Sequence, residues 1–135
     1  MRLWHKDLIS VLPRQQLLGQ WRECCAIAKS MKEKGTPNHI LVNKVMDYPK
    51  VHFIWYSYLI HEEMKRRGYQ SIWSGFMDYL GSELFYPIRN DLLLKDWHND
   101  QYLNQCLANL QEKHDCGGIS DEEWQKITDK YPKWR

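Results

Sequence analysis

The sequence predicts a mainly α-helical fold: a compact single domain over residues 1–135, with about four helices and packed loops rich in aromatic residues. The 135 residues match the length of one ordinary domain, and 43% hydrophobic against 27% charged residues is the balance of a chain that buries a core. Apolar residues recur at helical spacing in several segments, and no series of segments alternates apolar and polar residues as β-strands would. The composition argues against a disordered chain and against a fibrous repeat.

The first predicted helix begins after Pro13, a favourable first-turn residue, and ends before Gly35 and Pro37. The apolar residues of this segment are Leu17, Leu18, Trp21, Cys24, Cys25 and Ala28. Because they are spaced by three and four positions, we expect them to share one face and to pack on the core.

The second predicted helix begins near Pro49 and ends at Gly68, a residue suited to a helix C-terminus. Its apolar stripe is Val51, Ile54, Trp55, Tyr58 and Leu59. The short apolar segment from His39 to Met46, between the two helices, fits either a turn of helix or a buried connection.

Residues 69 to 97 contain Gly75, Gly81 and Pro87 and no sustained period, so we expect packed loops with short helical pieces. Of the 18 aromatic residues, eleven lie between positions 48 and 86, and we expect most of them in the core. Any ring that remains exposed is a candidate stacking platform for bases.

A third helix is predicted from Asn99 or Asp100 to about Lys113, ended by Gly117-Gly118. Its expected inner face is Leu103, Cys106, Leu107 and Leu110. A fourth helix starts at Ser120, which has capping-box spacing to Glu123.

The four cysteines, Cys24, Cys25, Cys106 and Cys116, are expected to be reduced thiols that act as small buried hydrophobic residues. No pair has the spacing of a zinc ribbon. No apolar run approaches the roughly 18 residues that a membrane span needs, and residues 1 to 7 lack a signal-peptide core. We therefore expect a cytoplasmic protein with no membrane partner, acting as a monomer.

Charge is distributed unevenly along the chain. Residues 1 to 50 hold nine of the 19 Lys and Arg against four acids, a net charge of +5, whereas residues 51 to 135 carry −3. A basic surface on the N-terminal half would suit nucleic acid, although an ordinary solvated face would show the same bias.

Glu23 lies opposite the apolar stripe of the first helix, at about 100° per residue. The same side carries Gln16, Gly19, Ala26 and Ile27 in place of the charged residues of a solvated face, so we expect something to pack there. Arg22, one position round, has a guanidinium suited to phosphate. The alternative is a surface glutamate paired with Lys29 or Arg22.

None of the six histidines forms the zinc-binding H-E-x-x-H pattern, because Lys65 stands where a second histidine would follow His61. Walker, dinucleotide-binding and G-x-S-x-G patterns are absent from the sequence as well. We expect no metal and no cofactor. A hydrolase using His5, His39 or His61 with nearby acids is the weakest alternative.

Several segments resemble the pyrimidine-dimer DNA glycosylase family, also called the endonuclease V family, most clearly over residues 1 to 70. They are Met1-Arg2-Leu3-Trp4, Gln15 to Glu23, His39 to Val42 with Met46-Asp47-Tyr48, and Lys65 to Tyr69. The C-terminal segment Tyr131 to Arg135 is similar to the aromatic and basic end of the family.

The resemblance implies a compact helical DNA glycosylase with abasic-site lyase activity on double-stranded DNA that contains a damaged or abasic nucleotide. The α-amine of Met1 would attack the C1′ carbon of the nucleotide, with Glu23 as the catalytic carboxylate. An α-amine suits this role because its reference pKa near 8 leaves about a tenth of it neutral at pH 7. The substrate-binding residues implied by the resemblance are Arg2, Arg22, Gln16, His39, Lys133 and Trp134.

The chain departs from the family pattern at three positions. The bulky Arg2 would block removal of Met1, so the nucleophile would be the amine of a retained methionine. Gln16 stands where the family has a histidine, and Ala26 where it has an arginine that contacts DNA, so activity on abasic sites is an alternative to dimer recognition. An alternative of another class is a noncatalytic helical module that binds nucleic acid or protein.

Overall fold

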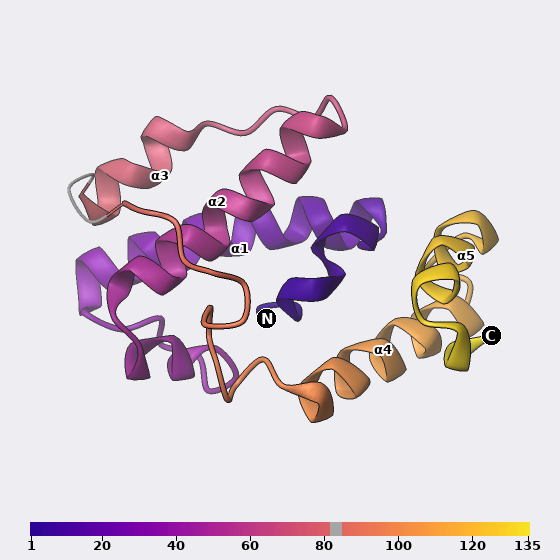
Figure 1. Ribbon diagram of the computed structural model, residues 1–135. Coiled ribbons are helices and arrows are strands. Elements are labelled where there is room, and N and C mark those ends of the chain that lie inside the picture. Colours follow the sequence, from indigo (N-terminus) through magenta and orange to yellow (C-terminus); the bar gives the residue numbers. More distant parts are fainter. Residues whose placement is uncertain (82–84) are drawn as a thin grey trace.

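The structure is a computed structural model that describes residues 1–81 and 85–135, and in this part of the chain it contains helices and no strands (Figure 1). The mainly α-helical prediction is confirmed. The elements in order are η1 (Lys6–Val11), α1 (Arg14–Lys34), η2 (Asn43–Asp47), α2 (Lys50–Arg66), α3 (Trp73–Leu80), α4 (Asp100–Asp115), α5 (Asp121–Lys130) and η4 (Pro132–Trp134). The described helices include none that is long and apolar enough to span a membrane.

The helix ends lie where local sequence places them. Gly35 ends α1 in the left-handed conformation with φ 75°, and its N–H donates to the Met31 carbonyl. Asn99 caps α4 by accepting from the Tyr102 N–H at 2.9 Å. Ser120 and Glu123 form the predicted capping box at the start of α5.

The molecule is arranged about its own N-terminal segment. Helix α1 packs against α2 and α3, while α5 contacts η1 and α4. Figure 1 shows the N-terminus in the middle of the molecule, between the α1–α2 pair and α4. Leu3, Leu8 and Leu12 are fully buried there, so the first twelve residues supply a central part of the core.

The predicted core faces are confirmed in part: of the stripe predicted for the second helix, Val51 and Ile54 are buried, whereas Trp55, Tyr58 and Leu59 are half-buried. In α1, Leu17, Trp21, Cys24 and Ala28 are buried, and in α4 the same holds for Cys106, Leu107 and Leu110. Residues 69 to 97 include the short helix α3 and extended or turn segments, as expected; positions 82–84 of this stretch lie outside the described residues.

The segment from His39 to Met46 is a turn followed by η2, and Ile40, Leu41 and Met46 are exposed. Of the two alternatives that the sequence left open, the turn of helix is therefore present and the buried connection is not. One burial prediction needs correction. All four cysteines are free, but Cys116 is exposed because it lies just past the end of α4, in the turn before α5. Among the aromatic residues, Tyr86 is exposed, whereas Phe53, Tyr56 and Phe76 are fully buried.

Candidate active site

The side chain of Gln20, only 1% exposed, joins the N-terminal segment to α1. Its Oε1 accepts from the Trp4 N–H at 2.7 Å, and its Nε2 donates to the Arg2 carbonyl at 2.9 Å and to Glu23 Oε2 at 3.3 Å. The N-terminal segment thus reaches Glu23 through Gln20, whereas Ala26, on the side where packing was predicted, is exposed. One buried amide holds both the second residue of the chain and the carboxylate of α1.

Two tyrosines hold the same segment from other helices. The Tyr56 hydroxyl, on α2, lies 2.6 Å from the Trp4 carbonyl and 2.9 Å from Gln20 Oε1, and the Tyr102 hydroxyl, on α4, donates to the Leu3 carbonyl at 2.6 Å. Burial raises the pKa of both tyrosines, so both hydroxyls keep their proton and remain donors.

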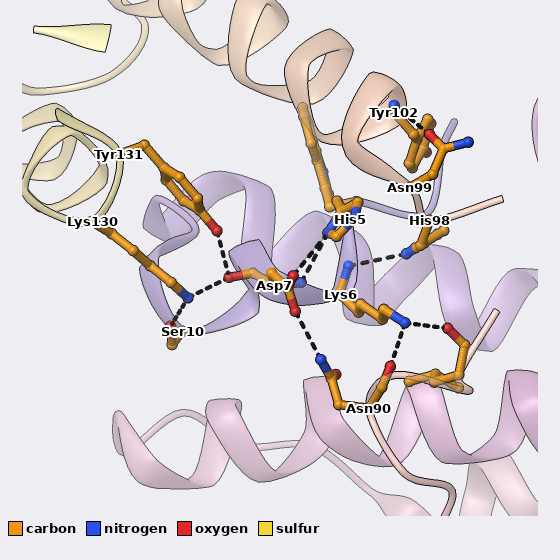
Figure 2. A network of polar contacts seen from close by, with 12 residues as sticks. His5, Lys6, Asp7, Ser10, Asn90, His98, Asn99, Tyr102, Lys130 and Tyr131 are labelled. Carbon is orange, nitrogen blue, oxygen red and sulfur yellow. Dashed lines mark hydrogen bonds and ion pairs between the residues drawn. The ribbon is translucent and has the colours of Figure 1, made fainter. Parts of the chain in front are cut away.

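Figure 2 shows how the next residues of the chain are held. The Lys6 N–H donates to His98 Nδ1 at 3.0 Å, and the Lys6 ammonium donates to the carbonyls of Asn90 and Leu93. From the C-terminal end, Lys130 and Tyr131 donate to the Asp7 carbonyl (Figure 2). The backbone of residues 2 to 7 is thus anchored by partners from both halves of the chain.

Met1 precedes this anchored segment and is 42% exposed. Among residues 1–81 and 85–135, no carboxylate lies within 4.0 Å of its α-amine, so the amine is not held in an ion pair. The half-buried Arg2 side chain lies over the Trp4 ring at 5.2 Å, with one guanidinium nitrogen 3.9 Å from the Cys106 sulfur.

A cleft of about 520 Å³ opens beside Arg2. One wall comes from Arg2 and from the turn before η2, and the other from the approach to α4 and its first turns. The lining residues are Arg2, Ile40, Leu41, Lys44, Asp96, Trp97, Asn99, Gln101, Tyr102 and Gln105. The cleft therefore offers an aromatic surface, amide groups and two cations next to the start of the chain.

Glu23, Arg22 and Gln16 lie along α1. Glu23 is half-exposed, and within the described part of the chain it forms no ion pair, so the alternative of a glutamate paired with Lys29 or Arg22 is wrong. Arg22 is exposed, and its guanidinium lies near Gly19, where an added Cβ would be 3.9 Å from its Nη2. The Gln16 Oε1 atom is buried without a hydrogen-bond partner among the described residues.

Residues 1–72, just over half of the chain, match the family model of pyrimidine dimer DNA glycosylases. The chain belongs to this family. No curated protein and no solved structure matches it. Membership implies DNA glycosylase activity with DNA as the substrate.

The part of the chain that matches the glycosylase family contains six of the eight predicted site residues. It supplies Met1, Arg2, Gln16, Arg22, Glu23 and His39, together with Gln20. The second wall of the cleft, residues 96 to 105, lies beyond the match. The cleft is therefore built jointly by the family region and by the C-terminal half.

Of the eight predicted site residues, Arg2 alone is among the described residues that line this cleft, and Met1, Gln16, Arg22 and Glu23 do not line it. Lys133 and Trp134 line a separate hollow of about 510 Å³ with Asn104, Gln111 and Arg135. His39 is half-buried and caps its own turn, since its Nδ1 accepts from the Leu41 N–H at 3.2 Å.

The histidines proposed for a hydrolase do not form one site. The buried His5 stacks on His98 at 5.2 Å, and His61 packs on Trp73 with its Nδ1 2.5 Å from Ser71 Oγ. Across residues 1–81 and 85–135, no three His, Cys, Asp or Glu side chains are grouped so as to hold a metal ion.

Sequence reasoning missed Gln20 and the wall of the cleft formed by residues 96 to 105. Gln20 precedes Glu23 by three positions, so the two lie on adjoining turns of the same side, and an uncharged glutamine there was the available indication. Trp97 and Tyr102 carried no comparable indication, because only folding brings them next to Arg2.

Proposed function

We propose that this chain is a DNA glycosylase with abasic-site lyase activity whose nucleophile is the α-amine of Met1. The observation that carries the proposal is the Gln20 bridge, which ties the Arg2 carbonyl and the Glu23 carboxylate to one buried amide. Met1 is the residue before this bridge, is 42% exposed, and its α-amine has no carboxylate within 4.0 Å among the described residues. Anchoring of the adjacent residue and access to solvent both favour reaction of this amine with a bound nucleotide.

In the proposed reaction the neutral amine of Met1 attacks C1′ of the damaged nucleotide. A bond forms between the amine nitrogen and C1′, the glycosidic bond breaks, and the base leaves with the bonding pair. The sugar ring opens to give an imine, loss of a C2′ proton follows, and the C3′–O bond breaks with release of the 3′ phosphate. At an existing abasic site the amine condenses with the sugar aldehyde and releases water.

Glu23 supplies the carboxylate for this sequence. Its negative charge stabilises the positive charge that develops on the sugar, and it accepts the proton in the elimination. Gln20 acts as a positioning residue, because its Nε2 donates to Glu23 Oε2 and so fixes one carboxylate oxygen.

The cations near the cleft suit the phosphates that flank the nucleotide. Arg2 and Lys44 line the cleft, and Arg22 lies exposed on the same helix as Glu23. Extrusion of a nucleotide from the duplex would expose its C1′ carbon to the amine. The substrate we propose is therefore double-stranded DNA with a damaged or abasic nucleotide, bound by a monomer.

Borohydride trapping tests this proposal. Reduction in the presence of duplex DNA that carries an abasic site or a pyrimidine dimer should join protein and DNA covalently. Residues added ahead of Met1 should abolish the adduct, because the α-amine is then displaced from the anchored segment. Failure to trap either substrate, combined with binding that weakens steeply as salt rises, would establish the noncatalytic nucleic-acid-binding module instead.

The role of Glu23 is tested with Glu23→Gln against the matched control Glu33→Gln, an exposed glutamate near the end of the same helix. Glu23→Gln should bind DNA with little change but lose strand cleavage, whereas Glu33→Gln should cleave at the wild-type rate. Equal cleavage by the two variants would exclude Glu23 as the catalytic carboxylate.

A further inference from the structure

Two adjacent apolar side chains project from the turn that precedes η2. Ile40 is 85% exposed and Leu41 is 53% exposed, while the next residue, Val42, is fully buried. Exposed single apolar residues are common on protein surfaces, but two neighbours at the tip of one turn form a local apolar projection.

Hydrogen bonds within the turn hold its backbone in place. The Val42 and Asn43 N–H groups donate to the His39 carbonyl at 3.0 and 2.9 Å, and the Leu41 N–H donates to His39 Nδ1. Asn43 Oδ1 accepts from the His39 N–H at 3.0 Å, so the two ends of the turn are bonded to each other. The apolar tip is therefore ordered before any partner arrives, and insertion costs little conformational entropy.

The position of the tip relates it to the proposed active site. Ile40, Leu41 and the cation Lys44 line the cleft that Arg2 also lines. Asp96 is the acid among the lining residues. An apolar tip next to two cations is complementary to stacked bases that lie between phosphate groups.

We propose that Ile40 and Leu41 form an apolar wedge that inserts into the base stack of duplex DNA beside the nucleotide that reacts with Met1. This inference rests on the proposed function and names a residue pair for its opening step. Extrusion of a nucleotide breaks base stacking on both of its sides, and an inserted apolar side chain covers the base faces that extrusion leaves open. The wedge lowers the cost of extrusion and is not needed where no duplex is present.

The test compares the double variant Ile40→Ser, Leu41→Ser with wild type and with Ile72→Ser. Ile72 is 71% exposed just before α3 and does not line the cleft, which makes it a matched control for loss of an exposed apolar side chain. Because Ile40 and Leu41 are exposed, the double variant removes little core packing and should fold normally.

The first measurement is the rate of borohydride trapping on duplex and on single-stranded abasic DNA. On duplex, the double variant should trap about 10-fold more slowly or worse, because base steps must then open without insertion. On single-stranded DNA, the double variant, Ile72→Ser and wild type should react at equal rates. A wild type that traps neither DNA refutes the proposed function, whereas equal rates of wild type and double variant on duplex refute the wedge alone.

The second measurement uses a duplex with an unreactive tetrahydrofuran abasic analogue and 2-aminopurine as the neighbouring base. Unstacking of the neighbour on binding should raise its fluorescence with wild type and Ile72→Ser, and the double variant should lose this rise. A fluorescence rise retained by the double variant would overturn the wedge. A change from dimer to monomer on substitution would also overturn it, by assigning the turn to self-association.

Discussion

Substitution of Gln20 by leucine would remove the bridge between the start of the chain and Glu23 while leaving an apolar side chain of similar size. Four hydrogen-bond contacts end at this amide: from the Trp4 N–H, from the Tyr56 hydroxyl, to the Arg2 carbonyl and to Glu23 Oε2. Leucine can form none of them. The variant therefore separates the anchoring of the N-terminus from the identity of the reacting groups, all of which remain.

The expected loss of stability follows from the groups left behind. The Trp4 N–H would remain buried without its acceptor, and the Arg2 carbonyl, in part-buried surroundings, would lose its donor. Each unpaired buried group costs about 1–3 kcal/mol, with less for one that water can reach, so we expect unfolding to become easier by about 2–4 kcal/mol. Urea unfolding followed by circular dichroism measures this change.

The effect on the reaction is measured by borohydride trapping at a temperature where the variant is folded. With the N-terminus released and Glu23 no longer oriented, trapping per folded molecule should slow by about 10- to 100-fold, the range over which positioning acts in enzymes. Leu80→Ala, a truncation of a buried residue at the end of α3, serves as the control. It should lose about 2–5 kcal/mol of stability yet react at the wild-type rate.

The reasoning would be refuted if Gln20→Leu unfolded at the wild-type urea concentration, because the bonds would then contribute nothing. It would equally be refuted if folded Gln20→Leu trapped abasic DNA as fast as wild type. If Leu80→Ala slowed trapping to the same extent, the slower trapping of Gln20→Leu would be due to lower stability in general.

Two further predictions concern stability. Burial, with the nearby charges of His5 and Lys6, lowers the pKa of His98 to about 2, so this ring is neutral in the folded state. The neutral ring's contribution to the free energy of unfolding is complete above the unfolded pKa near 6.5, and below that pH it falls by up to about 1.4 kcal/mol per pH unit. The substitution His98→Asn should make the loss of stability between pH 7 and pH 5 smaller, and urea unfolding at the two pH values measures this. Ser120→Ala should cost about 1 kcal/mol by removing the Glu123 N–H acceptor, and an unchanged urea midpoint would contradict the capping role.

The helices of this protein follow from its sequence alone, because the interactions that form them lie within a few residues of one another. Pro13 and Gly35 delimit α1, and Ser120 with Glu123 starts α5, as the spacing predicts. The apolar stripes of α1 and α4 likewise identify which faces are buried, since helical periodicity places those residues on one side. The family resemblance that implies catalytic roles for Met1 and Glu23 likewise rests on short sequence segments.

Only the tertiary structure decided how these parts meet. Trp4 is 16 residues from Gln20, and Leu3 is 99 residues from Tyr102, so no local pattern could pair them. The cleft beside Arg2 likewise needs a wall from residues 96 to 105, and the exposure of Ile40 depends on what the rest of the fold leaves uncovered. Local periodicity determines a helix and its buried face, whereas a site built from distant segments depends on packing that minimises unpaired polar groups and empty space over the whole molecule.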